Sequence, residues 1–422
     1  MRQKTIRNLP VHFRDACFLA EVPRKCLNTA VLFALAAVTV FSEAPDEVKQ
    51  FITGSIADKT RVISMLDMDE NLPERVRRLP GDAIEFVLSC RGDMGDSPEL
   101  ENLFLAALGK MRGNTAQDTE LLTAALAQTA SPKIAGAVIS RFYDLAKADP
   151  SQMKQAVPGI NAFLRDSFPS LGANADVIRS AVRTLELCGD SSSFDILLDY
   201  AAQMRDAQTA AAAQSALAGI GGAVEQNFLR AISERPAPEK LQIFRIIRNQ
   251  QLFSEEFKAK CAETALSQAI TIARDSGPLT RMNAVSGDVI AMQTEALTDI
   301  VRYEWTQSSQ LVLSLFPVAQ KEYEAGILSE DRFIQAIQAN AALGVSGAGR
   351  VLSNFLAVLN SITEKSSSDE KPVSAGVLLA LINTLGALGD KTAFDNLLYV
   401  TYLDYDAAVI KSAREALAKL KW

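Results

Sequence analysis

The sequence predicts an all-α fold, an α-solenoid in which antiparallel helix pairs stack into a right-handed superhelix. Residues 184–200, TLELCGDSSSFDILLDY, return at residues 384–400 as TLGALGDKTAFDNLLYV. Along the rest of the chain, apolar residues recur at the spacing of one helix face, and no stretch alternates as a strand would. A unit that is apolar on one side must cover that side with a further copy, so the chain is expected to grow by stacking.

The repeated stretch is predicted to be a tight helix-turn-helix. Apolar residues fall at 177, 178, 181, 182 and 185 before Gly189, and at 194, 197, 198 and 201 after Asp190. A glycine just past a helix can adopt the left-handed conformation that closes the last turn. An aspartate beside it can accept hydrogen bonds from the free amides that open the next helix.

A third copy lies at residues 343–349, LGVSGAG, within the period of about 40–47 residues that is typical of HEAT and armadillo units. The stretch LGALGDKTAFDNLL at 385–398 resembles the HEAT-like repeats of bacterial proteins, including those of phycobilisome lyases, whose pattern is roughly L-G-x-x-G-D-x-x-A-x-x-x-L. The third copy departs from it, with Ala348 in place of the aspartate. The resemblance implies the architecture and says little about activity.

From Pro98 onward we expect the helices to come in pairs. The expected pairs are 99–109 with 118–129, 132–148 with 151–167, 175–188 with 191–204, 207–219 with 222–234, 238–250 with 254–275, 288–305 with 308–325, 329–343 with 346–363, and 373–388 with 391–404, before a closing helix at 406–421. This gives a first repeat block at 98–275 and a second at 288–422, separated by a break or hinge at 276–287. Residues 364–372, EKSSSDEKP, are expected to form a polar loop.

Residues 1–42 have the features of a signal peptide. Arg24 and Lys25 precede the uncharged apolar run 27–41, which is too short for the roughly 20 residues of a membrane span. We expect cleavage after Ser42 and export to the periplasm or cell envelope. An uncleaved N-terminal anchor is the alternative. A start of translation downstream of Met1, at or near Val22, is a further hypothesis.

Residues 43–97 are predicted to form an N-terminal helical cap. One helix is expected at 46–66, followed by the charged stretch 67–82 and the apolar run 83–90. Residues 91–93 spell Arg-Gly-Asp, which is also an integrin-binding motif. Because they occupy the position that Cys-Gly-Asp occupies at 188–190, we interpret them as a turn between elements.

The charge of the chain argues against nucleic acid and against anionic lipid as partners. Removing the six basic and two acidic residues of 1–42 from the totals of 43 and 50 leaves 37 basic and 48 acidic residues, a net charge of −11. A chain this acidic is repelled by phosphate groups.

Catalytic and metal motifs are weak throughout. The only histidine, His12, is lost on cleavage, which removes any Ser-His-Asp or Cys-His arrangement and the commonest zinc ligand. The glycines at 344, 347 and 349 follow no strand and are interpreted as turn glycines, and Ser151-x-x-Lys154 lacks its companion motifs. Asp195 and Asp199 share a helix face, but two carboxylates are too few for calcium. We therefore expect no catalytic residue, no metal and no cofactor.

Three cysteines follow residue 42, and we expect all of them to be unbridged. Cys90, Cys188 and Cys261 lie one to two repeats apart, whereas a disulfide needs α-carbons within about 7 Å. Leu388 stands at the position of Cys188 in the second copy, so Cys188 is predicted to be a small core residue.

The last full unit carries the candidate binding residues Asp395, Tyr399, Tyr402 and Tyr405. Tyr399 replaces Asp199 of the first copy, so this helix has aromatic residues on a second side. They either pack beneath the closing helix and Trp422 or form an aromatic docking site for a protein partner.

The sequence thus favours an exported, non-catalytic scaffold or adaptor that binds other proteins along a concave face or at its ends. A lyase-like enzyme that uses Asp, Glu or Cys is the alternative by fold analogy alone. An envelope-structural protein held by an uncleaved N-terminus is the third possibility.

Overall fold

The computed structural model describes residues 45–68, 72–95, 97–111, 115–170, 174–203, 206–220, 224–276, 287–365 and 373–421. Within these ranges all named elements are helices, which confirms the predicted all-α fold. The predicted signal segment 1–42, Trp422 and most of the predicted loop 364–372 lie outside the described residues.

The chain divides into two compact units, Met1–Gly222 and Ala223–Trp422. The helices of the first unit are α3 (Asp46–Thr53), α4 (Ile56–Met65), α5 (Glu74–Met94), α6 (Pro98–Lys110), α7 (Ala116–Gln128), α8 (Pro132–Ala148), α9 (Val157–Ser167), α10 (Ala175–Cys188), α11 (Phe194–Gln203) and α12 (Ala207–Gly219). Those of the second unit are α13 (Val224–Glu234), α14 (Ala237–Asn249), α15 (Glu255–Asp275), α16 (Gly287–Arg302), α17 (Ser309–Glu324), α18 (Glu330–Ala342), α19 (Ala348–Lys365), α20 (Ala375–Leu388), α21 (Phe394–Val400) and α22 (Ala407–Lys419).

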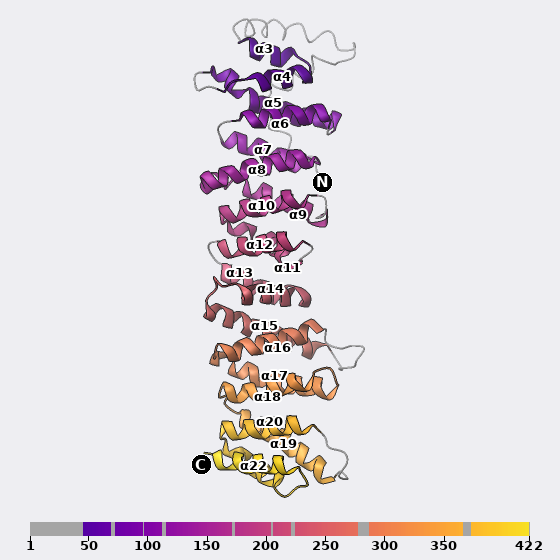
Figure 1. Cartoon of the computed structure of the whole chain (residues 1–422), viewed down its shortest axis with the longest axis vertical. Coiled ribbons are helices and arrows are strands. Elements are labelled where there is room, and N and C mark those ends of the chain that lie inside the picture. Colours follow the sequence, from indigo (N-terminus) through magenta and orange to yellow (C-terminus); the bar gives the residue numbers. More distant parts are fainter. Residues whose placement is uncertain are drawn as a thin grey trace. The chain divides into compact units, whose positions relative to one another are not determined.

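Each unit consists of two layers of helices. In the first unit, the odd-numbered helices pack on one another in sequence from α3 to α11, and the even-numbered helices do so from α4 to α12. The second unit has the same arrangement from α13 to α21 and from α14 to α22, with α17 and α19 joined by the Phe316–Phe355 ring contact. Figure 1 shows the helices of each unit stacked in chain order. The predicted stacking of helix pairs is therefore correct within each unit.

The two copies of the repeated stretch adopt the same turn. Gly189 (φ 59°) and Gly389 (φ 66°) end α10 and α20 in the left-handed conformation, and their amides donate to the carbonyls of Leu185 and Leu385. Asp190 and Asp390 then accept hydrogen bonds from the backbone amides two residues later, at 2.8 and 2.9 Å. Both predicted capping roles are confirmed.

A buried lysine caps a helix C-terminus at matching places near the start of each unit. The Lys59 ammonium, on α4, donates to the carbonyls of Phe51 and Ile52 at the end of α3. The Lys240 ammonium, on α14, donates to the carbonyls of Ile232 and Ser233 at the end of α13. Each lysine is the fourth residue of its helix and lies eight and seven residues after its acceptors. Together with the two Gly-Asp turns, these caps show that helices α3–α12 and α13–α22 have corresponding features in the same order.

The prediction of one helix at 46–66 is wrong, because α3 ends at Thr53 and α4 begins at Ile56. Ser55 caps α4 in a capping box with Asp58, which satisfies the amides at the new helix start. A Cβ atom on Gly54 would lie 2.7 Å from the Gln50 carbonyl oxygen, so the close approach there requires glycine. The apolar periodicity continues across the break and hides it.

The predicted turn at 91–93 is also wrong. These residues belong to the last turn of α5, which continues to Met94 and ends at Gly95 with φ 63°. The helix therefore ends at the second glycine of the stretch Arg-Gly-Asp-Met-Gly. Pro80 lies inside the same helix, so the charged stretch 67–82 is partly helical.

The three cysteines of the described part, Cys90, Cys188 and Cys261, are not bridged to one another, as predicted. Cys261 is fully buried on α15, and burial raises the pKa of its thiol. Cys188 is only half-buried, so its prediction as a core residue is wrong. It ends α10 beside the turn, where burial and the Asp190 carboxylate raise the pKa of its thiol to about 11.

The division into compact units falls at 222/223 and differs in place from the predicted break at 276–287. Residues 277–286 lie outside the described part, and α15 and α16 on either side pack against each other. Residues of the predicted cap, 43–97, form α3, α4 and α5, which belong to the two layers of the first unit. The predicted glycine turn at 343–349 is confirmed by positive φ angles at Gly344 (58°) and Gly347 (81°).

Candidate functional site

The candidate binding residues lie on helix α21 (Asp395 and Tyr399) and just after it (Tyr402 and Tyr405), and the turn before the helix sets its position. The Asp390 cap leads through the short 3-10 helix η5 (Lys391–Ala393) into α21 at Phe394. Leu397 and Val400 face the interior and are buried. Asp395 and Tyr399, at i and i+4 of α21, share a different face, and Tyr402 lies in the turn just after the helix.

Two of the three candidate tyrosines are exposed. Tyr402 has 75% of its surface exposed and Tyr399 has 37%, and Asp395, one turn before Tyr399, is also exposed. The Tyr399 hydroxyl donates a 2.6 Å hydrogen bond to the carboxylate of Glu364, at the end of α19. This bond raises the pKa of the Tyr399 hydroxyl. We call Glu364, Asp395, Tyr399 and Tyr402 the tyrosine surface.

Tyr405, the third candidate tyrosine, is buried with 8% exposure and is not part of this surface. Its hydroxyl donates to the Asn360 side-chain oxygen at 3.1 Å and accepts from the Thr363 hydroxyl at 3.0 Å. Of the two alternatives given by the sequence, packing and docking, Tyr405 therefore fits packing. It lies between α19 and the closing helix α22.

A series of polar side chains ties α21 to α19 beneath the tyrosine surface. The Asn396 amide donates to the Ser353 carbonyl at 3.0 Å and to its hydroxyl at 2.8 Å. The Asn360 amide donates to the Asn396 carbonyl at 3.0 Å, and Asn360 also accepts from Tyr405. Ser353 and Asn360 are both buried, so these bonds are shielded from water and hold α21 at a fixed position along α19.

The first unit has no tyrosines at the positions that correspond to Tyr399 and Tyr402. Asp195 and Asp199 stand at the places of Asp395 and Tyr399 on α11, and Ala202 stands at the place of Tyr402. The tyrosine of this helix, Tyr200, is buried and donates to the Leu164 carbonyl at 2.8 Å. Two helices with a common fold and a common stacking face thus differ in what they present outward.

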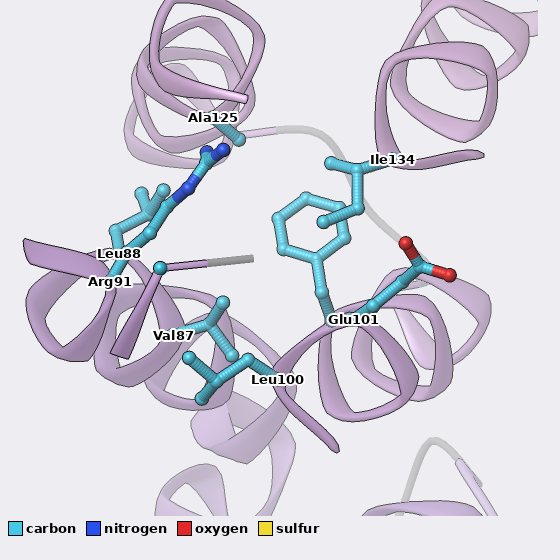
Figure 2. A pocket seen from close by; sticks show the side chains of 9 residues that line it. Val87, Leu88, Arg91, Leu100, Glu101, Ala125 and Ile134 are labelled. Carbon is cyan, nitrogen blue, oxygen red and sulfur yellow. The ribbon is translucent and has the colours of Figure 1, made fainter. Parts of the chain in front are cut away.

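Two hollows on the described part of the chain are both small. One of about 300 Å³, solvent space included, lies between α5, α6, α7 and α8 in the first unit; a water-sized sphere can enter only about 10 Å³ of it. Figure 2 shows apolar side chains around it and the charged ends of Arg91 and Glu101 on opposite sides. Glu101 is already paired with Ser131 at 2.5 Å and with Lys133 at 2.9 Å. That room suffices for about one water molecule and is too small for a ligand.

The second hollow lies next to Tyr405. It measures about 290 Å³ with its solvent space and is lined by Leu359, Val373, Ala375, Leu378, Tyr405, Asp406 and Val409. As in the first hollow, a water-sized sphere enters only about 10 Å³. It marks a packing gap under the closing helix rather than a site of its own.

Acidic side chains elsewhere are perturbed by burial. Asp82 and Glu85, one turn apart on α5, both have raised pKa values; that of Asp82 rises to about 6, from burial first and then from Glu85. In the described part of the chain, no group of three or more His, Cys, Asp or Glu side chains could hold a metal ion. None of the helices described is long and apolar enough to cross a bilayer.

No protein-family model and no curated protein matches the chain. Solved structures that are similar to it include the following two. An engineered protein is 14% identical, covers 88% of this chain and 97% of its own, and has a TM-score of 0.32. SYS-1 is 11% identical, and the match covers 86% of this chain and 84% of SYS-1, with a TM-score of 0.26. Such low TM-scores carry no argument about function.

The sequence singled out Asp395, Tyr399 and Tyr402 but missed Glu364, which holds Tyr399. Glu364 lies on another helix, and the pairing depends on how α19 and α21 pack. The Ser353–Asn360 pair was also missed, although it carried a signal. Polar residues seven apart on the buried stripe of a helix must find partners, and such partners come from the neighbouring helix.

Proposed function

We propose that this chain is a non-catalytic HEAT-like scaffold or adaptor, exported to the periplasm or cell envelope, that binds one or more proteins. The observation that carries the proposal is the tyrosine surface. Large aromatic side chains on a monomeric surface are enriched where partners bind. Tyr402 is mostly exposed, and the first unit has alanine, Ala202, at the corresponding position, so stacking alone does not require a tyrosine there.

Rigidity supports the same proposal. The buried hydrogen bonds of Ser353, Asn360 and Asn396 fix α21, and the bond to Glu364 orients the Tyr399 ring before any partner arrives. A surface that is already ordered loses less conformational entropy on binding. Export is proposed from the N-terminal sequence alone, and the acidic composition favours a protein partner over nucleic acid.

The test separates binding from packing. Tyr399 and Tyr402 are replaced by alanine together, and the melting temperature and the set of crosslinked proteins are compared with those of the unchanged chain. We expect partner capture from envelope extracts to be lost while the melting temperature changes little. A large fall in melting temperature would instead assign both tyrosines to packing.

A matched control is available in the first unit. Asp195→Ala with Asp199→Ala alters the corresponding helix face, and this variant should keep the captured partner. Tyr405→Phe should lower stability without altering partner capture, because its hydroxyl is buried between Asn360 and Thr363. Capture that is insensitive to the Tyr399/Tyr402 change would contradict the assignment of the site.

A further inference from the structure

We infer that the tyrosine surface binds a segment of another protein that is rich in arginine or lysine. The inference rests on the function proposed above and adds the chemistry of the partner. The exposed face of the Tyr402 ring can accept a guanidinium or ammonium group through a cation–π interaction. Asp395, an exposed residue of α21, supplies a carboxylate for a second cation.

The charges around the tyrosines favour a basic segment. Residues 390–406 contain four carboxylates, at Asp390, Asp395, Asp404 and Asp406, against one ammonium group, that of Lys391. Lys421, whose backbone pairs with Asp390, brings a second ammonium group to this region, so carboxylates remain in excess. Helix α19 ends beside them with one charge of each sign, Glu364 and Lys365. The local excess of negative charge would repel an acidic or phosphorylated segment and speed the encounter with a basic one.

The Glu364 carboxylate contributes in a second way. It accepts a 2.6 Å hydrogen bond from the Tyr399 hydroxyl and thereby holds the ring in one orientation. A charged acceptor makes this hydrogen bond stronger than one between neutral groups. The surface thus combines one fixed ring, one mostly exposed ring and an exposed carboxylate, a combination to which arginine and lysine side chains bind.

A second copy of this chain is a poor source of the basic segment. Its clearest basic stretch is Arg75, Arg77 and Arg78 at the start of α5. Arg78 already pairs with Glu74 at 2.7 Å, and Arg77 donates to the Leu72 carbonyl at 3.1 Å. Two copies, each with a net charge of −7 for the full sequence or −11 without residues 1–42, also repel one another. The inferred partner is therefore a different protein.

The experiment uses the full chain and two fluorescent peptides, one of repeated Arg-Gly-Ser units and one of repeated Glu-Gly-Ser units. Binding is followed by fluorescence anisotropy at low and at high salt. We expect the arginine peptide to bind, the glutamate peptide not to bind, and the affinity to fall as salt rises.

The variants assign the binding to this surface. Tyr402→Ala should lower the affinity for the arginine peptide about tenfold, whereas Tyr402→Phe should keep most of that affinity because the ring remains. Asp395→Asn should weaken it about threefold to tenfold by removing one charge pair. Asp195→Asn, at the matched position of the first unit, should leave it unchanged.

The inference is overturned by equal binding of the two peptides, by no binding of the arginine peptide, or by arginine-peptide binding that survives both Tyr402→Ala and Asp395→Asn. Concentration-dependent self-association that requires Tyr402 also overturns it, in favour of a second copy. These failures differ from failure of the proposed function. A captured partner that needs Tyr399 and Tyr402 but docks through a neutral segment would leave the scaffold standing and refute only the basic segment.

Discussion

At the residue scale, Glu322 is the most unusual side chain of the second unit. It lies on α17 with no exposed surface, and one of its oxygens accepts a 3.0 Å hydrogen bond from the Gln293 side chain. The other oxygen, Oε2, has no hydrogen-bond partner. Burial raises the pKa of this carboxyl above its usual 4.5, and the Gln293 bond opposes the rise. The folded protein therefore favours the protonated form more than the unfolded chain does.

A pH dependence of stability follows from that raised pKa. An acid whose folded pKa exceeds its unfolded value contributes stability that is present below the unfolded pKa and is lost as pH rises through the folded one. We expect the free energy of unfolding of the unchanged chain to fall, relative to Glu322→Gln, as pH rises above about 4.5. The difference should reach about 1–3 kcal/mol, the cost of an unsatisfied buried polar group.

Urea unfolding over a pH series measures this difference. Glu324→Gln, at an exposed position of the same helix, is the matched control and should give a curve parallel to that of the unchanged chain. Parallel curves for Glu322→Gln as well would contradict the prediction.

The two buried lysines make a second prediction at this scale. Lys240 donates to the Ile232 carbonyl at 2.7 Å and to the Gln268 side chain at 3.0 Å, and burial lowers the pKa of its ammonium group. Replacing it by methionine keeps the apolar stem but leaves the carbonyls at the end of α13 without a donor. We expect Lys240→Met to lower the free energy of unfolding by about 1–3 kcal/mol.

Lys59→Met should act in the same direction in the first unit, where the ammonium group also lies 5.1 Å from the Phe51 ring and 5.0 Å from the Phe86 ring. Lys321→Met, at an exposed position, should be nearly neutral. Denaturant unfolding of the three variants checks both statements. If Lys321→Met lowered the free energy of unfolding as much as Lys59→Met and Lys240→Met, capping by the buried lysines would not explain the loss.

At the element scale, the Gly-Asp turns determine how one helix follows another. Gly389 has φ 66°, a conformation that costs L-residues roughly 1–2 kcal/mol. Its carbonyl also accepts a 2.9 Å bond from the Lys421 amide, which brings the end of the chain back to the turn. Gly189 occupies the same conformation in the first unit, and an added Cβ there would lie 3.4 Å from the Gly219 carbonyl oxygen.

We expect Gly189→Ala and Gly389→Ala each to lower stability by about 1–2 kcal/mol because both force alanine into the left-handed region. Gly386→Ala acts through another mechanism, since its Cβ would lie 2.9 Å from the Cα of Ala416 and push α20 away from α22. We expect this overpacking to lower the stability of Gly386→Ala by about 1–3 kcal/mol. Thermal unfolding of the three variants tests whether each of them lowers stability. Gly92→Ala is the control, because a Cβ there meets nothing within 4 Å.

At the scale of the whole molecule, the two units predict where the chain can be divided. Each unit contains its own two layers and its own interior, and repeat proteins are stabilised by contacts between neighbouring repeats. A fragment of residues 223–422 should therefore fold by itself. A fragment of residues 287–422 removes α15, against which α16 packs, and should be less stable.

Circular dichroism and urea unfolding of the two fragments measure this difference. A cooperative transition is expected for 223–422, with a lower midpoint for 287–422. Equal midpoints would favour a boundary at the predicted break, 276–287, over the division at 222/223.

Local physics determined much of the fold from sequence alone. The helix periodicity, the left-handed glycines and the capping aspartates each depend on residues close together along the chain, so the helices from Pro98 onward and both Gly-Asp turns could be predicted. The errors at 46–66 and 91–93 are also local. Ser55 and Asp58 carried a capping-box signal that the continuing apolar stripe obscured, and Gly95 is a second glycine that competes with Gly92 for the helix end.

What only the tertiary structure decided was which side chains meet across helices. The sequence placed Tyr399, Tyr402 and Tyr405 in one group, because all three follow one another on or just after one helix. The packing of α19 against α21 and α22 separated them, burying Tyr405 against Asn360, pairing Tyr399 with Glu364 and leaving Tyr402 in solvent. Burial and hydrogen-bond partners depend on which neighbouring helix approaches each face, and residues some 35–45 positions apart meet only once the helices have stacked.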